Sequence, residues 1–142
     1  MRRLQGIVRR AVSWILLAVI LGCGTSHRAA VVGKVSLDGK PVDDGIITFI
    51  PSGDNRGSPA WGKIQAGDYA IPAKTGPSVG TNRVEIRWAR KTGRMVPIDP
   101  TIEETVEAVP VRYNSQSVLQ VEIKPGTNQF DFNLNSDSAR KP

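Results

Sequence analysis

The chain has 142 residues, of which 39% are hydrophobic, and a formal net charge of +6 at pH 7. This length suits one domain with a real hydrophobic core and leaves too little for two comfortable ones. Only one cysteine is present, so no disulfide within the chain can stabilise the fold and burial of apolar side chains must do so.

The N-terminal segment has the pattern of a secretory signal. An apolar run over residues 11–21 contains one polar residue, Ser13, and follows four arginines: Arg2, Arg3, Arg9 and Arg10. A basic region, a short apolar run and a small residue at the cleavage site are typical of such signals. As a helix the run would reach about 16 Å, against about 30 Å of bilayer hydrocarbon, so it is too short to span. We expect residues 1–22 to be a signal helix that is removed.

Residues 20–23 read Ile-Leu-Gly-Cys and resemble the bacterial lipobox. The resemblance implies cleavage between Gly22 and Cys23 and lipid attachment at the thiol of Cys23, although Leu21 is bulkier than the usual residue there. The alternative is a plain signal followed by an incidental cysteine. One acyl chain holds a protein only reversibly, so the several chains of a bacterial lipoprotein would be needed for stable anchoring.

Cleavage before Cys23 would leave 120 residues with 15 Lys and Arg against 13 Asp and Glu, because the four arginines are lost. That balance does not indicate nucleic-acid binding. The resemblance to lipoproteins implies outer-membrane sorting, on the periplasmic or the surface face, because Gly24 and not Asp follows the cysteine. Residues 23–30 form a short tether, in which the seven residues after Cys23 reach at most about 25 Å, so the tether would keep the domain close to its membrane.

From residue 30 onward, apolar and polar residues alternate with a period of two, which predicts strands that bury one face. Loop-forming residues crowd together over 52–59, and Asp38-Gly39 and residues 65–67 mark hairpin turns. Pro125 followed by Gly126 suits a type II turn. The predicted strands cover residues 30–37, 45–50, 61–64, 68–71, 81–91, 118–123 and 129–134.

The sequence therefore predicts an all-β fold: a seven-stranded antiparallel Ig-like or transthyretin-like sandwich, preceded by the N-terminal signal helix. The residues expected to face the core are Val35, Leu37, Ile47, Phe49, Ile64, Tyr69, Ile71, Val84, Ile86, Trp88, Leu119, Val121, Ile123, Phe130, Phe132 and Leu134.

Several short motifs carry a family resemblance, among them the Gly-Lys-Val of residues 33–35, the Leu-Asp-Gly-Lys-Pro-Val of 37–42, the Gly-Asp-Tyr of 67–69 and the Gly-Thr-Asn-Gln-Phe-Asp-Phe of 126–132. They are similar to those of the carboxypeptidase regulatory-like domain, in the lipoprotein form abundant in planctomycete bacteria. The resemblance covers residues 31–135 and leaves 136–142 as a flexible tail. It implies a transthyretin-like fold and an accessory, adhesive or stalk role, without a peptidase portion.

The sequence contains few of the residues that usually carry out catalysis. The single histidine, His27, lies in the tether, so no Ser/His or Cys/His arrangement can be built in the domain. The carboxylate pairs Asp43-Asp44 and Glu103-Glu104 consist of adjacent residues, which point to opposite faces of a strand. We expect no catalytic residue and no cofactor.

For two further chemistries, a crosslink and a calcium site, a solvated surface is the favoured alternative. A Lys–Asn isopeptide crosslink would need Lys34, Asn133 and Glu85 to meet in a desolvated site, but all three are out of phase with the apolar residues of their strands. A calcium site would need many oxygen ligands at a defined spacing, which is not found among the loop carboxylates Asp38, Asp43, Asp44 and Asp54.

The segment 92–109 is expected to be a long loop without strands, and residues 101–104 have the capping-box spacing of a helical turn. Connections of this length are usually functional or disordered, so this loop is the first candidate for partner binding, with a variable surface excursion as the alternative. The candidate residues are Pro97, Pro100, Glu103, Glu104 and Glu107.

A basic stripe is the second candidate surface, formed by Arg83, Arg87 and Lys91, with Arg90 and Arg94 nearby. It could contact anionic headgroups or glycans, and the alternative is a solvated strand face that discourages edge pairing. Sugar binding would need exposed aromatic rings, for which the strand phase leaves Trp61 and Tyr113.

These features together predict a lipid-anchored, non-enzymatic protein of the bacterial cell envelope. The leading hypothesis is a binding, adhesion or accessory module for an envelope glycan or protein. The alternatives are a passive structural envelope protein and, least favoured, a carbohydrate-active enzyme. No nucleic-acid partner is expected, and the sequence does not predict the oligomeric state.

Overall fold

The computed structural model describes residues 27–97 and 100–136, which form eleven strands and one short 3-10 helix. The signal peptide predicted over 1–22, the lipid site at Cys23 and the end of the tail lie outside the described residues. Within the described part of the chain, no helix is long and apolar enough to cross a bilayer. Arg28 forms a β-bridge with Ser78, and Ala29 is buried. The folded body therefore begins by residue 28, and not after residue 30 as the predicted tether implied.

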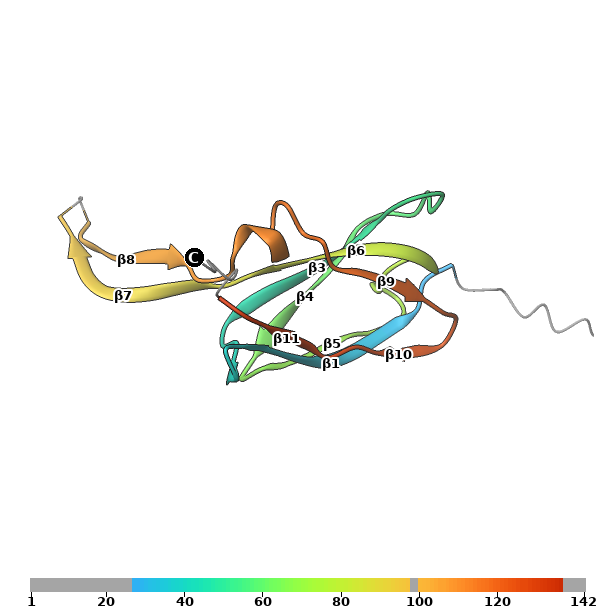
Figure 1. The fold of residues 1–142 in the computed structure, drawn as a ribbon, viewed down its shortest axis with the longest axis horizontal. Helices are drawn as coiled ribbons and strands as arrows, with labels where there is room; N and C mark the ends of the chain where they lie inside the picture. Colours follow the sequence, from blue (N-terminus) through green and yellow to red (C-terminus); the bar gives the residue numbers. More distant parts are fainter. Residues whose placement is uncertain (1–26, 98–99, 137–142) are drawn as a thin grey trace, which may run out of the picture.

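The strands are arranged as one large curled sheet and a separate two-stranded ribbon (Figure 1). The order in the large sheet is β10-β1-β5-β4-β3-β6-β9, with β2 and β11 also paired to β1. The bounds are β1 Ala30–Leu37, β2 Lys40–Pro41, β3 Gly45–Pro51, β4 Ala60–Gln65, β5 Asp68–Ile71, β6 Gly80–Arg87, β7 Ala89–Val96, β8 Ile102–Glu107, the 3-10 helix Val111–Tyr113, β9 Gln120–Ile123, β10 Thr127–Gln129 and β11 Phe132–Leu134.

The all-β class is confirmed, but two details of the predicted sandwich differ. The described residues contain eleven strands where seven were predicted. Pairing is antiparallel throughout, except that β1 runs parallel to both β10 and β11. The first strand of the body therefore sits beside the last, which curls the sheet around its core (Figure 1).

Local turn chemistry explains where the hairpins form. Asp38 and Gly39 both have positive φ, at 52° and 76°, as do Ala66 and Gly67, at 49° and 86°. Two consecutive positive φ values match the twist of the flanking strands in a two-residue hairpin. Gly126 has φ +97°, which the predicted type II turn requires at its third position. The two predicted hairpin turns are confirmed, whereas residues 125–126 form a bend in which the positive φ of Gly126 is the feature shared with a type II turn.

Two predicted strands are interrupted. The strand expected over 129–134 is broken between β10 and β11, where side chains bond to the backbone. The hydroxyl of Tyr69 donates to the Phe130 carbonyl at 2.9 Å, and the Lys34 N–H donates to Asp131 Oδ1 at 2.8 Å. The strand expected over 81–91 is broken at Trp88, whose N–H donates to a glutamate side chain, Glu107 Oε1, at 2.9 Å.

The core follows the predicted phase closely. Of the residues expected to face inward, all are buried except Trp88, Leu119, Val121 and Phe130, which are half-buried and pack against the core. Burial of these side chains is the main stabilising contribution to the fold, at roughly 1.5–3 kcal/mol for each large one. Further buried hydrophobic residues are Ala29, Val31, Val42, Ala60 and Val109.

Tyr69 makes the stability of the fold sensitive to alkaline pH. It is 4% exposed and its ring packs between those of Phe49 and Phe132. Burial raises the pKa of Tyr69 above its ordinary value of 10.0. The unfolded chain ionises near pH 10, so this contribution is complete below pH 10 and is lost as the pH rises further.

We expect the free energy of unfolding of the wild type to fall above about pH 10, by at most about 1.4 kcal/mol per pH unit from this one group. The Tyr69→Phe variant should lose about 1 kcal/mol at neutral pH through the missing hydrogen bond, but should lack this alkaline component. Urea unfolding at pH 8 to 12 measures the difference. The same alkaline slope in both proteins would contradict the prediction.

Candidate functional site: the projecting hairpin

Strands β7 and β8 form a two-stranded hairpin that extends away from the body (Figure 1). The prediction that residues 92–109 form a loop without strands is wrong, as is the helical turn at 101–104, since β8 spans Ile102–Glu107. The ladder pairs Ala89 with Glu107 and Val96 with Ile102, with an irregularity between Lys91 and Met95. The hairpin is exposed on both sides, so its sequence lacks the apolar alternation by which half-buried strands are detected.

The base of the hairpin is held by Glu107. Its Oε1 accepts hydrogen bonds from the N–H of Trp88 at 2.9 Å and of Val109 at 3.0 Å, and the Ala108 N–H donates to the Trp88 carbonyl at 2.9 Å. A carboxylate that accepts two backbone hydrogen bonds fixes the local chain direction. Glu107, predicted to contact a partner, therefore joins the hairpin to the body.

The other two candidate glutamates also make contacts within the hairpin. Glu103 pairs with Lys91 Nζ at 3.1 Å and accepts from the Gly93 N–H at 3.2 Å. Glu104 accepts from Thr92 Oγ1 at 3.1 Å and lies 4.0 Å from Arg94. Exposed ion pairs of this kind contribute only about 0–1 kcal/mol each. They order the hairpin without leaving a concentrated acidic surface.

The tip and one face of the hairpin are accessible. Pro97 and Pro100 are exposed and flank the tip. Opposite residues of a ladder share a face, as do residues two apart on one strand. Ile102 lies opposite Val96, and Val106 is on the same face as Ile102. We call these three residues the apolar hairpin face.

The apolar hairpin face was missed in the sequence. Ile102 is 50% exposed and Val106 46%, while Met95, on the other side of the hairpin, is 58% exposed. The spacing of Ile102 and Val106, four residues apart around Glu104, places them on one face of a strand, but the prediction of a loop for this segment gave that spacing no structural meaning. Exposed aliphatic side chains on one face of a projecting ribbon are available for contact with a partner, although Glu104 and Arg90 share this face.

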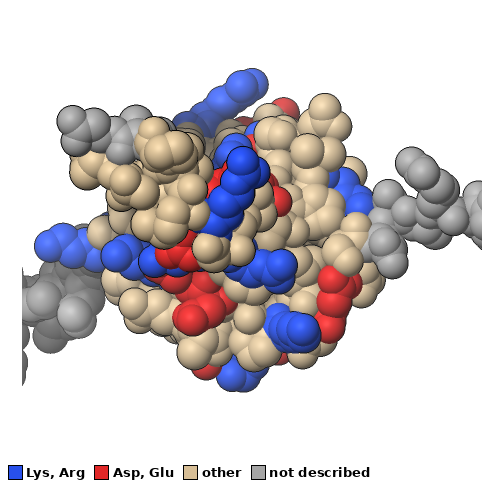
Figure 2. All heavy atoms as spheres, turned by 90° about the vertical axis from the view of Figure 1, so that its left-hand side faces the viewer, with Lys and Arg blue, Asp and Glu red and all other residues tan. Residues whose placement is uncertain are grey.

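The basic stripe is divided into separate ion pairs. Arg83 and Arg87 lie on the outer face of β6 on either side of Glu85, as predicted, at 2.8 and 3.9 Å from its carboxylate. Lys91 lies on β7 and pairs with Glu103. Figure 2, in which the hairpin end faces the viewer, shows acidic side chains between the basic ones. This end of the molecule has no single sign of charge.

Of the three residues proposed for a crosslink, Lys34 and Asn133 lie on the paired strands β1 and β11 and line a common hollow, but Glu85 lies apart from them. Lys34 Nζ lies 2.5 Å from Asp68 Oδ1, and this hydrogen bond raises the pKa of Lys34, which opposes the neutral amine that a nucleophile needs. Asn133 Oδ1 accepts from Ser36 Oγ at 2.8 Å. Glu85 lies on β6, which β5, β4 and β3 separate from β1 in the sheet.

The loop carboxylates make local hydrogen bonds. Hydrogen bonds with the side chain of Ser136 and with its N–H, the latter at 2.8 Å from Asp38 Oδ1, lower the pKa of Asp38. Asp43 Oδ1 accepts from the Ala66 N–H at 3.1 Å. Among residues 27–97 and 100–136, no three His, Cys, Asp or Glu side chains are placed to hold a metal ion.

The two aromatic residues considered for sugar binding differ in exposure. Trp61 is 62% exposed on the outer face of β4. Tyr113 is half-buried against the core, and the Arg112 guanidinium lies 4.7 Å from the centre of its ring. Trp61 alone of these two presents an open ring.

Comparison with known proteins gives no matching family model, no matching curated protein and no matching solved structure. The placement of the described residues is therefore the basis for the function. A projecting ribbon whose two strands, in the described chain, pair only with each other can accept another strand at an edge or bind a surface with its apolar face.

Proposed function

We propose that this protein is a non-enzymatic module of the bacterial cell envelope, anchored through a lipid on Cys23, that binds an envelope protein through the β7–β8 hairpin. The observation that carries the proposal is the position of the hairpin. It projects at one end of the molecule, while the first described residues enter β1 at the other (Figure 1). A membrane anchor five residues before Arg28 would thus be attached at the end of the body opposite the hairpin, which leaves the hairpin accessible to a partner.

The composition of the hairpin favours a protein over a glycan as partner. The segment 89–107 contains no aromatic residue, and its exposed apolar side chains are aliphatic, namely Met95, Ile102 and Val106. Isolated two-stranded hairpins are marginally stable in water. A partner that adds a strand or covers the apolar hairpin face would therefore stabilise the hairpin as it binds.

Two features of the sequence support an accessory role and a location in the outer membrane. The resemblance of the sequence to carboxypeptidase regulatory-like domains suggests an accessory or adhesive function, and Gly24 suggests the outer membrane. A passive structural role in the envelope is the second candidate. Its support is that Glu103, Glu104 and Glu107 all serve the hairpin itself.

The anchoring is tested by expressing the full chain and its Cys23→Ser variant in a Gram-negative bacterium. We expect the wild type in the detergent-extracted membrane fraction, with a mature N-terminus at Cys23 and the added mass of its acyl chains. The variant should lack the acyl mass. A wild type that is soluble without detergent, or that begins downstream of Cys23, would refute the anchor.

The binding role is tested by photo-crosslinking from the hairpin in living cells. We expect one reproducible crosslinked protein. A double variant, Ile102→Thr with Val106→Thr, should weaken its capture roughly tenfold or more, because buried apolar area is lost while strand propensity is kept. The matched control is Val118→Thr, since Val118 is 72% exposed outside the hairpin. Undiminished capture by the double variant, or no partner at all, would favour the passive role.

A further inference from the structure

The end of the molecule opposite the hairpin is formed by segments that are distant in sequence. The Val79 N–H donates to the His27 carbonyl at 2.9 Å, and the Ala29 N–H donates to the Pro77 carbonyl at 3.0 Å. Ser78 Oγ donates to Asn55 Oδ1 at 3.1 Å, which ties in the β3–β4 loop. The first described residues, this loop and the β5–β6 connection thus form one surface.

A hollow of about 540 Å³ opens on this surface beside the exposed ring of Trp61. Arg28 Nη1 donates to the Gly76 carbonyl at 2.9 Å, which holds the guanidinium at the hollow, and Lys74 is an exposed member of its lining. A neighbouring hollow of about 300 Å³ includes His27 and Arg56. We call His27, Arg28, Arg56, Trp61 and Lys74 the tether-end surface.

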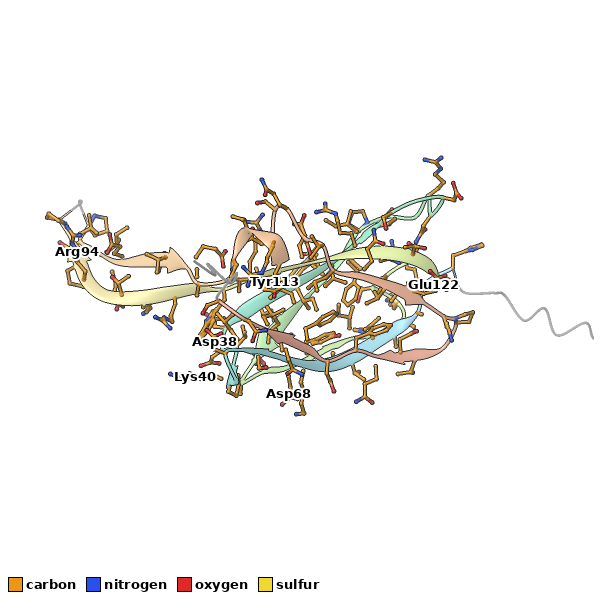
Figure 3. The ribbon with its side chains drawn as sticks, in the orientation of Figure 1. Asp38, Lys40, Asp68, Arg94, Tyr113 and Glu122 are labelled. Carbon is orange, nitrogen blue, oxygen red and sulfur yellow. The ribbon has the colours of Figure 1, made fainter. Side chains whose placement is uncertain are left out.

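The tether-end surface carries an excess of positive charge. The connecting segments at this end (27–29, 52–59, 72–79 and 124–126) contain four basic residues and one carboxylate, Asp54. Glu122 on β9, which Figure 3 shows near this end, accepts a hydrogen bond from Thr81 Oγ1 at 2.8 Å. The basic residues at the tether end are Arg28, Arg56, Lys74 and Lys124.

We propose that the tether-end surface binds the headgroups of anionic phospholipids in the membrane that anchors the chain. This inference rests on the proposed lipid at Cys23, which lies within about 18 Å of Arg28 along a fully extended chain. The indole of tryptophan favours the boundary between headgroups and acyl chains. Each basic residue close to an anionic membrane raises partitioning about fivefold.

This contact would set the orientation of the domain. A lipid alone leaves the body free to rotate about its short tether. Binding through Trp61, Arg28 and Lys74 would turn the end with the hollow toward the membrane. The hairpin, at the other end in Figure 1, would then point outward.

The test uses the chain from Gly24 onward, without lipid. All eleven strands and the buried core lie between Ala29 and Leu134, so this chain holds the whole described fold. Its tryptophans are Trp61 and Trp88, because Trp14 is removed. Trp88→Phe therefore makes Trp61 the only tryptophan and a direct reporter. The probes are vesicles of phosphatidylcholine alone and of phosphatidylcholine with one third phosphatidylglycerol.

We expect the protein to float with the vesicles that contain phosphatidylglycerol, with a blue shift of Trp61 emission, and not with phosphatidylcholine alone. Salt should weaken the binding. Lys74→Glu should lower partitioning about thirtyfold, for a change of two charge units, and Trp61→Ala about tenfold. The matched control is Lys40→Glu, because Lys40 lies on the far side of the body (Figure 3). It should bind like the wild type.

Three results would overturn the inference: no flotation, an equal loss in Lys40→Glu, or binding to an acidic polysaccharide such as alginate without binding to vesicles. The last would assign the hollow to an acidic sugar. The vesicle experiment and the test of the lipid anchor can fail independently. If cells carry no lipid on Cys23, the anchor is refuted but the vesicle result stands. If the protein does not bind vesicles, the tether-end surface is refuted but the anchor stands.

Discussion

Asn82→Asp should lower the free energy of unfolding by about 4 kcal/mol at neutral pH, the range in which a buried charge is left without a partner. Asn82 is fully buried, and its Nδ2 donates to the carbonyls of Ser78 at 2.9 Å and Gly80 at 2.8 Å. A carboxylate there would face two carbonyl oxygens and could donate to neither while ionised. Because Ser78 lies in the β5–β6 connection and Gly80 begins β6, the tether-end surface should lose its order first.

The pH dependence identifies the cause. Burial would raise the pKa of the introduced aspartate above its unfolded value of about 3.9. The loss of stability should therefore be smallest below about pH 4 and grow as the pH rises. Asn82→Ala removes the same two hydrogen bonds without a charge, so it should cost less and show no such dependence. Urea unfolding from pH 3 to pH 8 measures both, and equal stabilities at neutral pH would contradict the prediction.

Gly33→Ala is expected to have the second largest effect, with a loss of about 3 kcal/mol, at the upper end of what overpacking costs. A Cβ at Gly33 would lie 1.8 Å from the Phe130 carbonyl oxygen and 3.0 Å from the Tyr69 hydroxyl. Neither can move easily, because these two groups are hydrogen-bonded to each other and the Phe130 N–H donates to the Val32 carbonyl. The substitution would push the C-terminal segment off β1.

The control for this prediction is Gly39→Ala. A Cβ at Gly39 would meet nothing within 4 Å, but its φ is +76°, so the substitution should cost only the backbone strain of about 1–2 kcal/mol. Guanidinium unfolding of both variants compares the two effects. If Gly33→Ala proved no less stable than Gly39→Ala, the close approach at Phe130 would not be what selects glycine there.

The fold could be predicted from the sequence where one face of a strand is buried. The alternation around Ile47 and Phe49, and around Val84 and Ile86, reports the core directly, because a shift by one residue would expose every apolar side chain. The hairpin could not be predicted in this way, because neither of its faces is buried and it therefore shows no apolar alternation. Its charged side chains pair with each other across the two strands. The parallel pairing of β1 was equally hidden, because pattern alone does not specify a partner.

The candidate site shows the same limit. The exposure of Trp61 follows from its phase on β4 and was predicted. The hollow beside Trp61 was not, because it depends on Arg28 and Lys74, far apart in sequence, reaching the same place. The three glutamates of the hairpin were predicted to bind a partner, but the hydrogen bonds that they accept within the hairpin depend on a strand geometry that the segment was not expected to have.

The position of β1 also has a consequence for the order in which the molecule is completed. Its N–H at Lys34 is satisfied by Asp131, 97 residues later, and both of its parallel partners come after residue 126. A newly made chain cannot finish its sheet until residue 134 has emerged, and contacts across such separations form slowly. If the chain is exported as proposed, this delay would keep the polypeptide unfolded while it is threaded through a narrow export channel.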